Sequence, residues 1–140
     1  MPKRIRLTLD GVEAVARLNE EAAPETVAKF WAALPVEETL RHVRWGGEAG
    51  YILIRKLADK TQPIENRISI YPPASIGFRP EHGEVAFSYG QAQARDHVRP
   101  ATWACHLATI ETNVDAFFAK VRATRAEGGK PIRLAREESR

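Results

Sequence analysis

The sequence contains little cysteine and no long apolar run, and both shortages exclude classes of protein. Cys105 is the only cysteine, so no internal disulfide can form, which is typical of a reducing compartment. No stretch of 18 or more apolar residues exists, so no membrane-spanning helix is expected. The first residues, Met-Pro-Lys-Arg-Ile-Arg, lack the apolar core of a secretory signal. These shortages predict a cytoplasmic protein without a membrane partner.

Motifs that hold phosphates or metal ions are missing as well. The pairs Gly46-Gly47 and Gly128-Gly129 do not have the spacing of a P-loop or of a dinucleotide-binding fingerprint. A metal site needs three or more converging ligands, and the histidines form neither an HxH nor an HExxH pattern. The sequence therefore predicts no cofactor and no bound metal.

The charge balance is mildly basic, with a net charge of +3 and a pI near 9.2. The basic residues are scattered among 18 acidic residues, and even the densest basic cluster, 122–136, contains Glu127. Nucleic-acid-binding proteins usually gather their positive charge on one face. A solvated surface is favoured, and weak nucleic-acid binding through the basic C-terminal helix is a minor alternative.

Length and composition are those of one globular domain. Apolar residues make up 44% and charged residues 28% of the 140 residues, which is an ordinary globular mixture. A chain of this length buries roughly two thirds of its unfolded surface and needs no disulfide or metal to fold. We expect a single domain over residues 1–140, with a frayed tail at 137–140.

Alternation of apolar and polar residues predicts strands along most of the chain. Ile5, Leu7 and Leu9 alternate with polar residues, Asp10-Gly11 suits a two-residue turn, and alternation resumes over 12–18, which together predict a hairpin. Further strands are expected at 40–45, 51–54, 67–71, 84–89, 102–110 and 131–136. The segments 46–50, 74–83 and 90–100 are expected to be irregular.

Two helices are expected, at 24–34 and 113–127. The first has Pro24 in its first turn and an apolar stripe of Val27, Phe30, Trp31 and Leu34; the second has Asn113 as its cap and ends at Gly128-Gly129. About eight strands and two helices predict a mainly β fold, a closed or nearly closed barrel. An open α+β sandwich with helices on one face is the alternative.

Short motifs resemble a known family. Residues 8–18, followed by Ala23-Pro24-Glu25-Thr26-Val27 and Phe30, resemble the opening of the cyclophilins. Residues 4–122 resemble an uncharacterised bacterial family of small cyclophilin-like proteins, through His42-Val43-Arg44-Trp45-Gly46-Gly47-Glu48, Glu65-Asn66 with Tyr71-Pro72, and residues 106–110. The resemblance implies a cyclophilin-like barrel.

The resemblance does not extend to the prolyl isomerase site. Cyclophilins bind proline through an arginine and a following strand with Phe, Met and Gln. Arg44 lies where that arginine is expected, but Trp45-Gly46-Gly47-Glu48 interrupts the strand and no Phe-Met-x-Gln follows. Prolyl isomerase activity is therefore not expected.

Four residues are candidates for acid–base chemistry: His42, Glu48, Glu65 and His106. Both histidines lie within expected strands, and a carboxylate beside a histidine can set its tautomer and raise its pKa. Alternation places His106 on one face with Ala104 and Ala108, which leaves room around its ring for a pocket that the other three approach. A half-buried histidine bonded to backbone is the structural alternative.

Four further residues are candidates for ligand binding: Arg44, Trp45, Asn66 and Tyr71. They suggest a small-molecule site, binding or hydrolytic, on the barrel wall near the four acid–base candidates. The alternative is a non-catalytic peptide- or protein-binding module, with the aromatic residues filling the barrel. A homo-oligomer of closed symmetry is also expected, a dimer being the commonest form.

Overall fold

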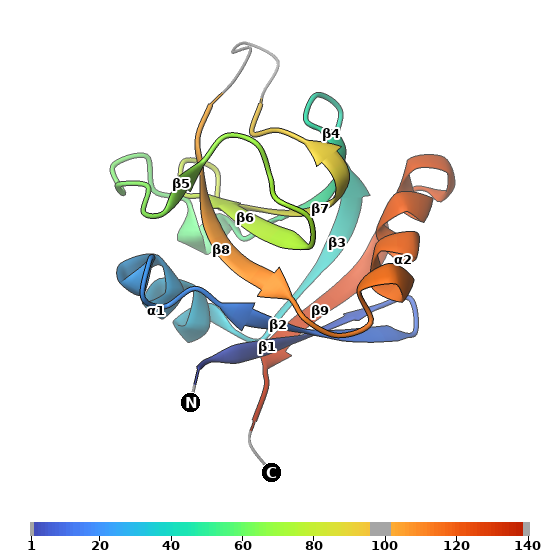
Figure 1. Cartoon of the computed structure of the whole chain (residues 1–140), viewed down its shortest axis with the longest axis horizontal. Coiled ribbons are helices and arrows are strands. Elements are labelled where there is room, and N and C mark those ends of the chain that lie inside the picture. The colour runs from blue at the N-terminus through green and yellow to red at the C-terminus, as the bar shows by residue number, and fades with distance from the viewer. Residues whose placement is uncertain (1, 96–101, 139–140) are drawn as a thin grey trace.

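A computed structural model describes residues 2–95 and 102–138 of the chain (Figure 1). In this part, nine strands, two α-helices and one short 3₁₀ helix follow one another. Their bounds are β1 Arg4–Leu9, β2 Val12–Leu18, α1 Pro24–Ala33, β3 Val36–His42, β4 Gly47–Leu53, η1 Arg55–Leu57, β5 Arg67–Ile68, β6 Ser75–Arg79, β7 Glu84–Ala92, β8 Ala104–Ile110, α2 Val114–Glu127 and β9 Lys130–Arg136. No helix among the described residues is long and apolar enough to cross a membrane.

Eight of the strands form a closed antiparallel barrel. Neighbouring strands follow the order β2-β1-β9-β3-β4-β7-β6-β8, and pairing of β2 with β8 closes the ring. The ninth strand, β5, pairs with β8 beside β2, at Ala104 and Cys105. Closure satisfies the backbone groups that an open sheet would leave at its edges. The predicted mainly β barrel is confirmed, and the open sandwich is excluded.

One apolar core fills the barrel, and both helices contribute to it. The expected hairpin, β1 and β2, turns Ile5, Leu7 and Leu9 inward, where each is fully buried. The helices lie on opposite sides of the barrel in Figure 1, and Phe30 of α1 and Phe117 of α2 belong to the same core cluster. A single continuous core is what a one-domain chain requires.

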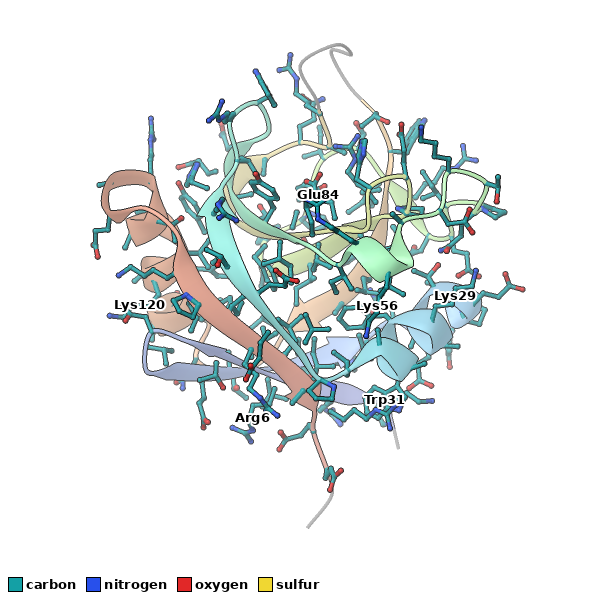
Figure 2. The ribbon with its side chains drawn as sticks, turned by 180° about the vertical axis from the view of Figure 1, so that it is seen from behind. Arg6, Lys29, Trp31, Lys56, Glu84 and Lys120 are labelled. Carbon is teal, nitrogen blue, oxygen red and sulfur yellow. The ribbon has the colours of Figure 1, made fainter. Side chains whose placement is uncertain are left out.

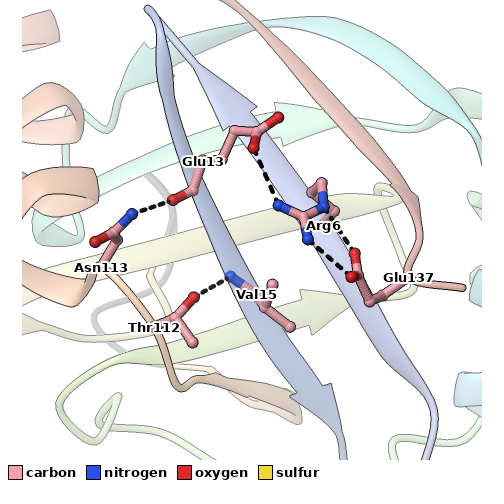
Figure 3. A network of polar contacts seen from close by, with 6 residues as sticks. All are labelled: Arg6, Glu13, Val15, Thr112, Asn113 and Glu137. Atoms are coloured by element: carbon pink, nitrogen blue, oxygen red, sulfur yellow. Dashed lines mark hydrogen bonds and ion pairs between the residues drawn. The ribbon is translucent and has the colours of Figure 1, made fainter. Parts of the chain in front are cut away.

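The predicted helices are confirmed, although two of their residues act differently from expectation. Trp31, labelled in Figure 2, belongs to the stripe expected in the core but is only partly buried. The cationic groups of Lys3 and Arg136 lie 5.7 and 5.2 Å from its ring centre. Asn113 precedes α2 as predicted, but it makes no side-chain cap. Its amide instead donates to the Glu13 carbonyl, at 2.8 Å (Figure 3).

Several strand bounds differ from the sequence prediction. Strand β3 begins earlier, at Val36, and residues 47–50, expected as a loop, belong to β4. The glycines there have a packing reason: a Cβ on Gly50 would lie 2.9 Å from Val121. The strand expected at 67–71 is shorter, as β5, and the strand expected at 84–89 is longer, as β7.

The segment expected to be irregular at 74–83 contains β6, whose five residues are all buried. Ile76 and Phe78 of this strand belong to the core and alternate with Ser75, Gly77 and Arg79, so the period of a strand is present, but it is short and has a glycine in its middle. At the tail, the Glu137 carboxylate accepts two hydrogen bonds from Arg6, at 2.7 and 2.8 Å (Figure 3). Residues 139–140 of the expected tail lie outside the described residues.

Candidate functional site

The outer wall of the barrel over β4, β7 and β6 carries small residues. Successive strand residues point to opposite faces, so Val85 and Phe87 enter the core while Ala86 faces outward. Ala49, Ala86 and the ring of Tyr71 form a second, smaller apolar cluster on this outer face. A Cβ on Gly77 would lie 2.5 Å from Cε1 of Tyr71, so this glycine allows the ring to lie against the sheet.

A cavity of about 240 Å³ opens on this wall. Its volume lies slightly below the roughly 300–1,000 Å³ of typical ligand sites, which suits a small ligand. Apolar and aromatic side chains dominate its lining, with a few charged groups among them. The lining residues are Val43, Arg44, Trp45, Gly46, Ala49, Tyr51, Leu53, Tyr71, Arg79, His82, Glu84, Ala86, Gln93 and Arg95. We call it the wall pocket.

An ion pair lies at the wall pocket. Arg79 and Glu84 are cross-strand partners on β6 and β7, and Nη1 of Arg79 lies 3.5 Å from Oε2 of Glu84. The Arg79 side chain is only 4% exposed, and its Nη1 also donates to the Arg95 carbonyl at 3.1 Å. Figure 2 labels Glu84, in the upper half of the view. Burying charge costs free energy, so such a pair beside a cavity makes this wall the candidate functional site.

The phenol of Tyr71 is neutral in this environment. Burial raises the pKa of Tyr71 above its ordinary value, the negative charge of Glu84 raises it further, and the positive charge of Arg79 opposes both. A neutral phenol can donate one hydrogen bond and accept others. Tyr71 therefore offers both functions next to a cation and an anion.

Three of the four residues expected to bind a ligand line the wall pocket: Arg44, Trp45 and Tyr71. Asn66 does not line it; its amide donates to the His106 carbonyl, at 2.9 Å. The Asn19 amide donates to the same carbonyl at 2.9 Å. The two asparagines thus form hydrogen bonds with β8 between the residues that pair with β5 and the residues that pair with β2.

The four acid–base candidates have separate hydrogen-bond partners in the described part of the chain. His42 bonds Tyr89, and Glu48 accepts from the Gln91 backbone N–H at 2.9 Å. Glu65 holds the start of α1, accepting from the N–H and the hydroxyl of Thr26 at 2.7 and 2.6 Å. Burial alone would raise the pKa of Glu65, but these hydrogen bonds lower it below its ordinary value.

His106 lies in a groove of its own, with Asn66 and Thr109. Its Nε2 is 3.4 Å from the Thr109 hydroxyl, and burial lowers the pKa of its ring. The expected alternation is wrong at one point: Ala108 joins the barrel core rather than the His106 face. The pairing of β6 with β8 shifts by one residue there, so Leu107 and Ala108 both point inward.

Sequence reasoning missed the charged pair of the wall pocket, Arg79 and Glu84. Arg79 falls in the segment expected to be irregular, 74–83, whereas Glu84 opens the strand expected at 84–89, so no pairing between the two was expected. The available signal was their position: an arginine and a glutamate on either side of Pro80-Glu81-His82-Gly83 can become opposite residues of a hairpin.

The fold and the wall pocket define a small closed antiparallel barrel with a pocket on its outer wall. The chain belongs to the family described as "Protein of unknown function (DUF3830)", whose model matches residues 5–136. No curated protein matches the chain.

Two of the solved structures that share the fold show its extent. "Structure of McbB in complex with tryptophan" superposes with a TM-score of 0.77 at 19% identity, covering 97% of this chain and 45% of that one. The solution structure of the hypothetical protein AF2241 from Archaeoglobus fulgidus superposes with a TM-score of 0.70 at 20% identity, covering 97% and 95%. This chain therefore spans less than half of the McbB chain. Identities this low establish a common fold alone.

Proposed function

We propose that the protein binds a small organic molecule in the wall pocket. The observation that carries this proposal is the Arg79–Glu84 ion pair beside a cavity with a largely apolar and aromatic lining. Apolar cavities with a few converging polar groups and a titratable group of shifted pKa are the usual form of ligand sites. Tyr71 supplies the shifted group.

The lining indicates the chemistry of the ligand. Trp45 and Tyr51 offer rings for a planar apolar group. Glu84 offers a negative charge, and Arg79, Arg44 and Arg95 offer positive charges. An arginine binds a carboxylate and a glutamate binds an ammonium group, so an aromatic amino acid suits the pocket. Tryptophan is the first compound to test, because the McbB structure of similar fold was solved with it. In this proposal Arg44, Trp45 and Tyr71 are ligand-binding residues.

Thermal denaturation with tryptophan and a panel of aromatic carboxylates and amines tests the proposal. A ligand at one hundred times its Kd stabilises a protein by about 2.7 kcal/mol, an effect easily measured as a rise in Tm. Trp45→Ala should abolish the rise for the bound compound. Trp103→Ala is the matched control, because both tryptophans are about half exposed (51% and 49%) but only Trp45 lines the wall pocket. The proposal is contradicted if no compound raises the Tm, or if Trp45→Ala and Trp103→Ala reduce the rise in Tm equally.

A peptide is the second candidate ligand. A shallower depression of about 610 Å³ adjoins the wall pocket and shares Trp45, Tyr71 and Arg95 with it. Ile70, which is 70% exposed, lines this depression. An extended ligand could occupy both hollows. Tighter binding of tryptophan-containing tripeptides than of free tryptophan would favour the peptide.

We also propose that the barrel is of the cyclophilin-like kind, since a hairpin leads into α1 and two helices flank eight strands. The single cysteine favours the cytoplasm.

Three large apolar side chains, Trp45, Ile70 and Trp103, are exposed, which favours a homo-oligomer. Light scattering at the mass of one chain across micromolar concentrations would contradict an oligomer.

A further inference from the structure

His42 and Tyr89 are joined by a short hydrogen bond whose direction the structure determines. Nδ1 of His42 lies 2.8 Å from the Val43 carbonyl oxygen, and Nε2 lies 2.7 Å from the Tyr89 hydroxyl. A carbonyl oxygen only accepts hydrogen bonds, so Nδ1 carries the proton. In the neutral ring Nε2 is then an acceptor, and the Tyr89 hydroxyl donates to it. A base is thus aligned on the phenol.

Tyr89 also lines an open groove of about 770 Å³ between β7 and α2. None of the described residues that line this groove lines the wall pocket. The Arg122 guanidinium lies 5.2 Å from the Tyr89 ring centre, and Arg122 lines the groove as well. Tyr89 therefore bonds His42 through its hydroxyl, while its ring lies beside the Arg122 cation at the groove.

The phenol needs this base to react near neutral pH. Burial raises the pKa of Tyr89, as does the negative charge of Glu48, while Arg125 and Arg122 act in the opposite direction. The net change is upward, so Tyr89 stays protonated at neutral pH. A protonated phenol is a weak nucleophile, and an aligned base that removes its proton as the new bond forms is the usual remedy.

We propose that Tyr89 is a nucleophile activated by His42, and that it accepts an acyl group from small activated carbonyl compounds that carry a negative charge. In the step, the Tyr89 oxygen bonds to the carbonyl carbon and the bond from that carbon to the leaving group breaks. The phenol proton passes to Nε2 of His42 and from there to the leaving group. Arg122 binds the negative charge of the compound, and Arg125 stabilises charge that develops on the phenol oxygen.

Acetylation of the intact protein tests this step with two probes. N-acetylimidazole is uncharged and acetyl phosphate is anionic; peptide mass mapping measures the acetyl group gained by each tyrosine. We expect Tyr89 to be acetylated faster than Tyr51, which is also half-buried. Hydroxylamine should remove the group, as expected of a phenol ester. Equal rates at Tyr51 and Tyr89 would overturn the proposal without any variant.

His42→Gln separates a base from a structural partner. Glutamine can still accept the hydrogen bond from Tyr89, through an amide oxygen near the position of Nε2, but it cannot take up a proton. The acetylation rate of Tyr89 should fall about a hundredfold or more, the ordinary contribution of a positioned base. Lys60→Gln, which changes an exposed side chain that lines neither the groove nor the wall pocket, should leave the rate unchanged. An unchanged rate in His42→Gln would overturn the proposal.

Two further measurements test the remaining parts of the proposal. The difference between wild type and His42→Gln should close at a pH high enough to ionise the phenol by itself, because a base is then no longer required. Arg122→Gln should slow acetylation by acetyl phosphate but not by N-acetylimidazole. Equal slowing with both probes would overturn the assignment of the anionic group to Arg122.

Discussion

Arg79 and Glu84 stand opposite each other at the end of the β6–β7 hairpin, and their side chains form an ion pair on the outer wall, with Nη1 and Oε2 3.5 Å apart. The same pair borders the wall pocket and acts on the Tyr71 phenol. The stability of the fold and the proposed ligand binding therefore depend on the same two side chains. Substitutions can separate the effect on stability from the effect on binding.

Glu84→Gln should lower the free energy of unfolding by about 1–3 kcal/mol, because the buried Arg79 loses a compensating charge. Urea denaturation measures the change. Glu37→Gln is the control: its carboxylate is 77% exposed and pairs with Arg133 at 3.4 Å on the surface. Such surface pairs contribute about 0–1 kcal/mol. Equal losses in the two variants would contradict the structural role of the buried pair.

Gly77→Ala should destabilise the protein by about 1–3 kcal/mol, the usual cost of overpacking a well-packed site. The new Cβ would meet the Tyr71 ring at 2.5 Å and displace it from the sheet. Thermal denaturation measures the loss, and compounds that bind the wall pocket should bind the variant more weakly. In a Tyr71→Ala background the same substitution should cost much less, because the clash is gone. An equal cost in both backgrounds would exclude this contact as the cause.

Glu65→Gln should destabilise the protein by about 1 kcal/mol at neutral pH, through weaker hydrogen bonds at the start of α1. Because the pKa of Glu65 is lowered in the folded state, its ionised form stabilises the protein above the ordinary carboxyl pKa. That contribution is lost as the pH falls through the folded pKa. The difference between variant and wild type should therefore shrink below about pH 4.5. Urea denaturation from pH 3 to 7 measures it, and a pH-independent difference would contradict this role.

Cys105 should resist alkylation in the folded protein. Burial raises the pKa of its thiol to about 12, helped by the negative charge of Glu65 and opposed by a hydrogen bond with Thr26. The reactive thiolate is then scarce at pH 8, and the side chain is fully buried. Mass spectrometry after iodoacetamide treatment should find the native protein unmodified and the urea-unfolded protein fully modified. Rapid modification without urea would contradict the placement of Cys105 in the core.

Elements with a local pattern could be predicted from the sequence. The alternation of Ile5, Leu7 and Leu9 around the Asp10-Gly11 turn predicted the hairpin, and apolar stripes predicted both helices. The strand β6 was missed, because only Ile76 and Phe78 mark its period and the residue between them is Gly77, which is unusual inside a strand. That its other face is also buried, against Tyr71, could not be read from the sequence. A pattern of polar and apolar residues records burial on one side only.

For the candidate site, the sequence by itself determined which chemistry was available, since Arg44, Trp45, Tyr71, His42 and Glu48 were identified from their residue types. Only the tertiary structure decided which of them meet. In the folded chain Arg44, Trp45 and Tyr71 line the wall pocket. His42 forms a hydrogen bond with Tyr89, and Glu65 accepts hydrogen bonds at the start of α1. The physical reason is that residue type and local period are properties of a few neighbouring residues. Strand register, by contrast, depends on packing across the whole barrel, and a one-residue shift in β8 was enough to change which residues face His106.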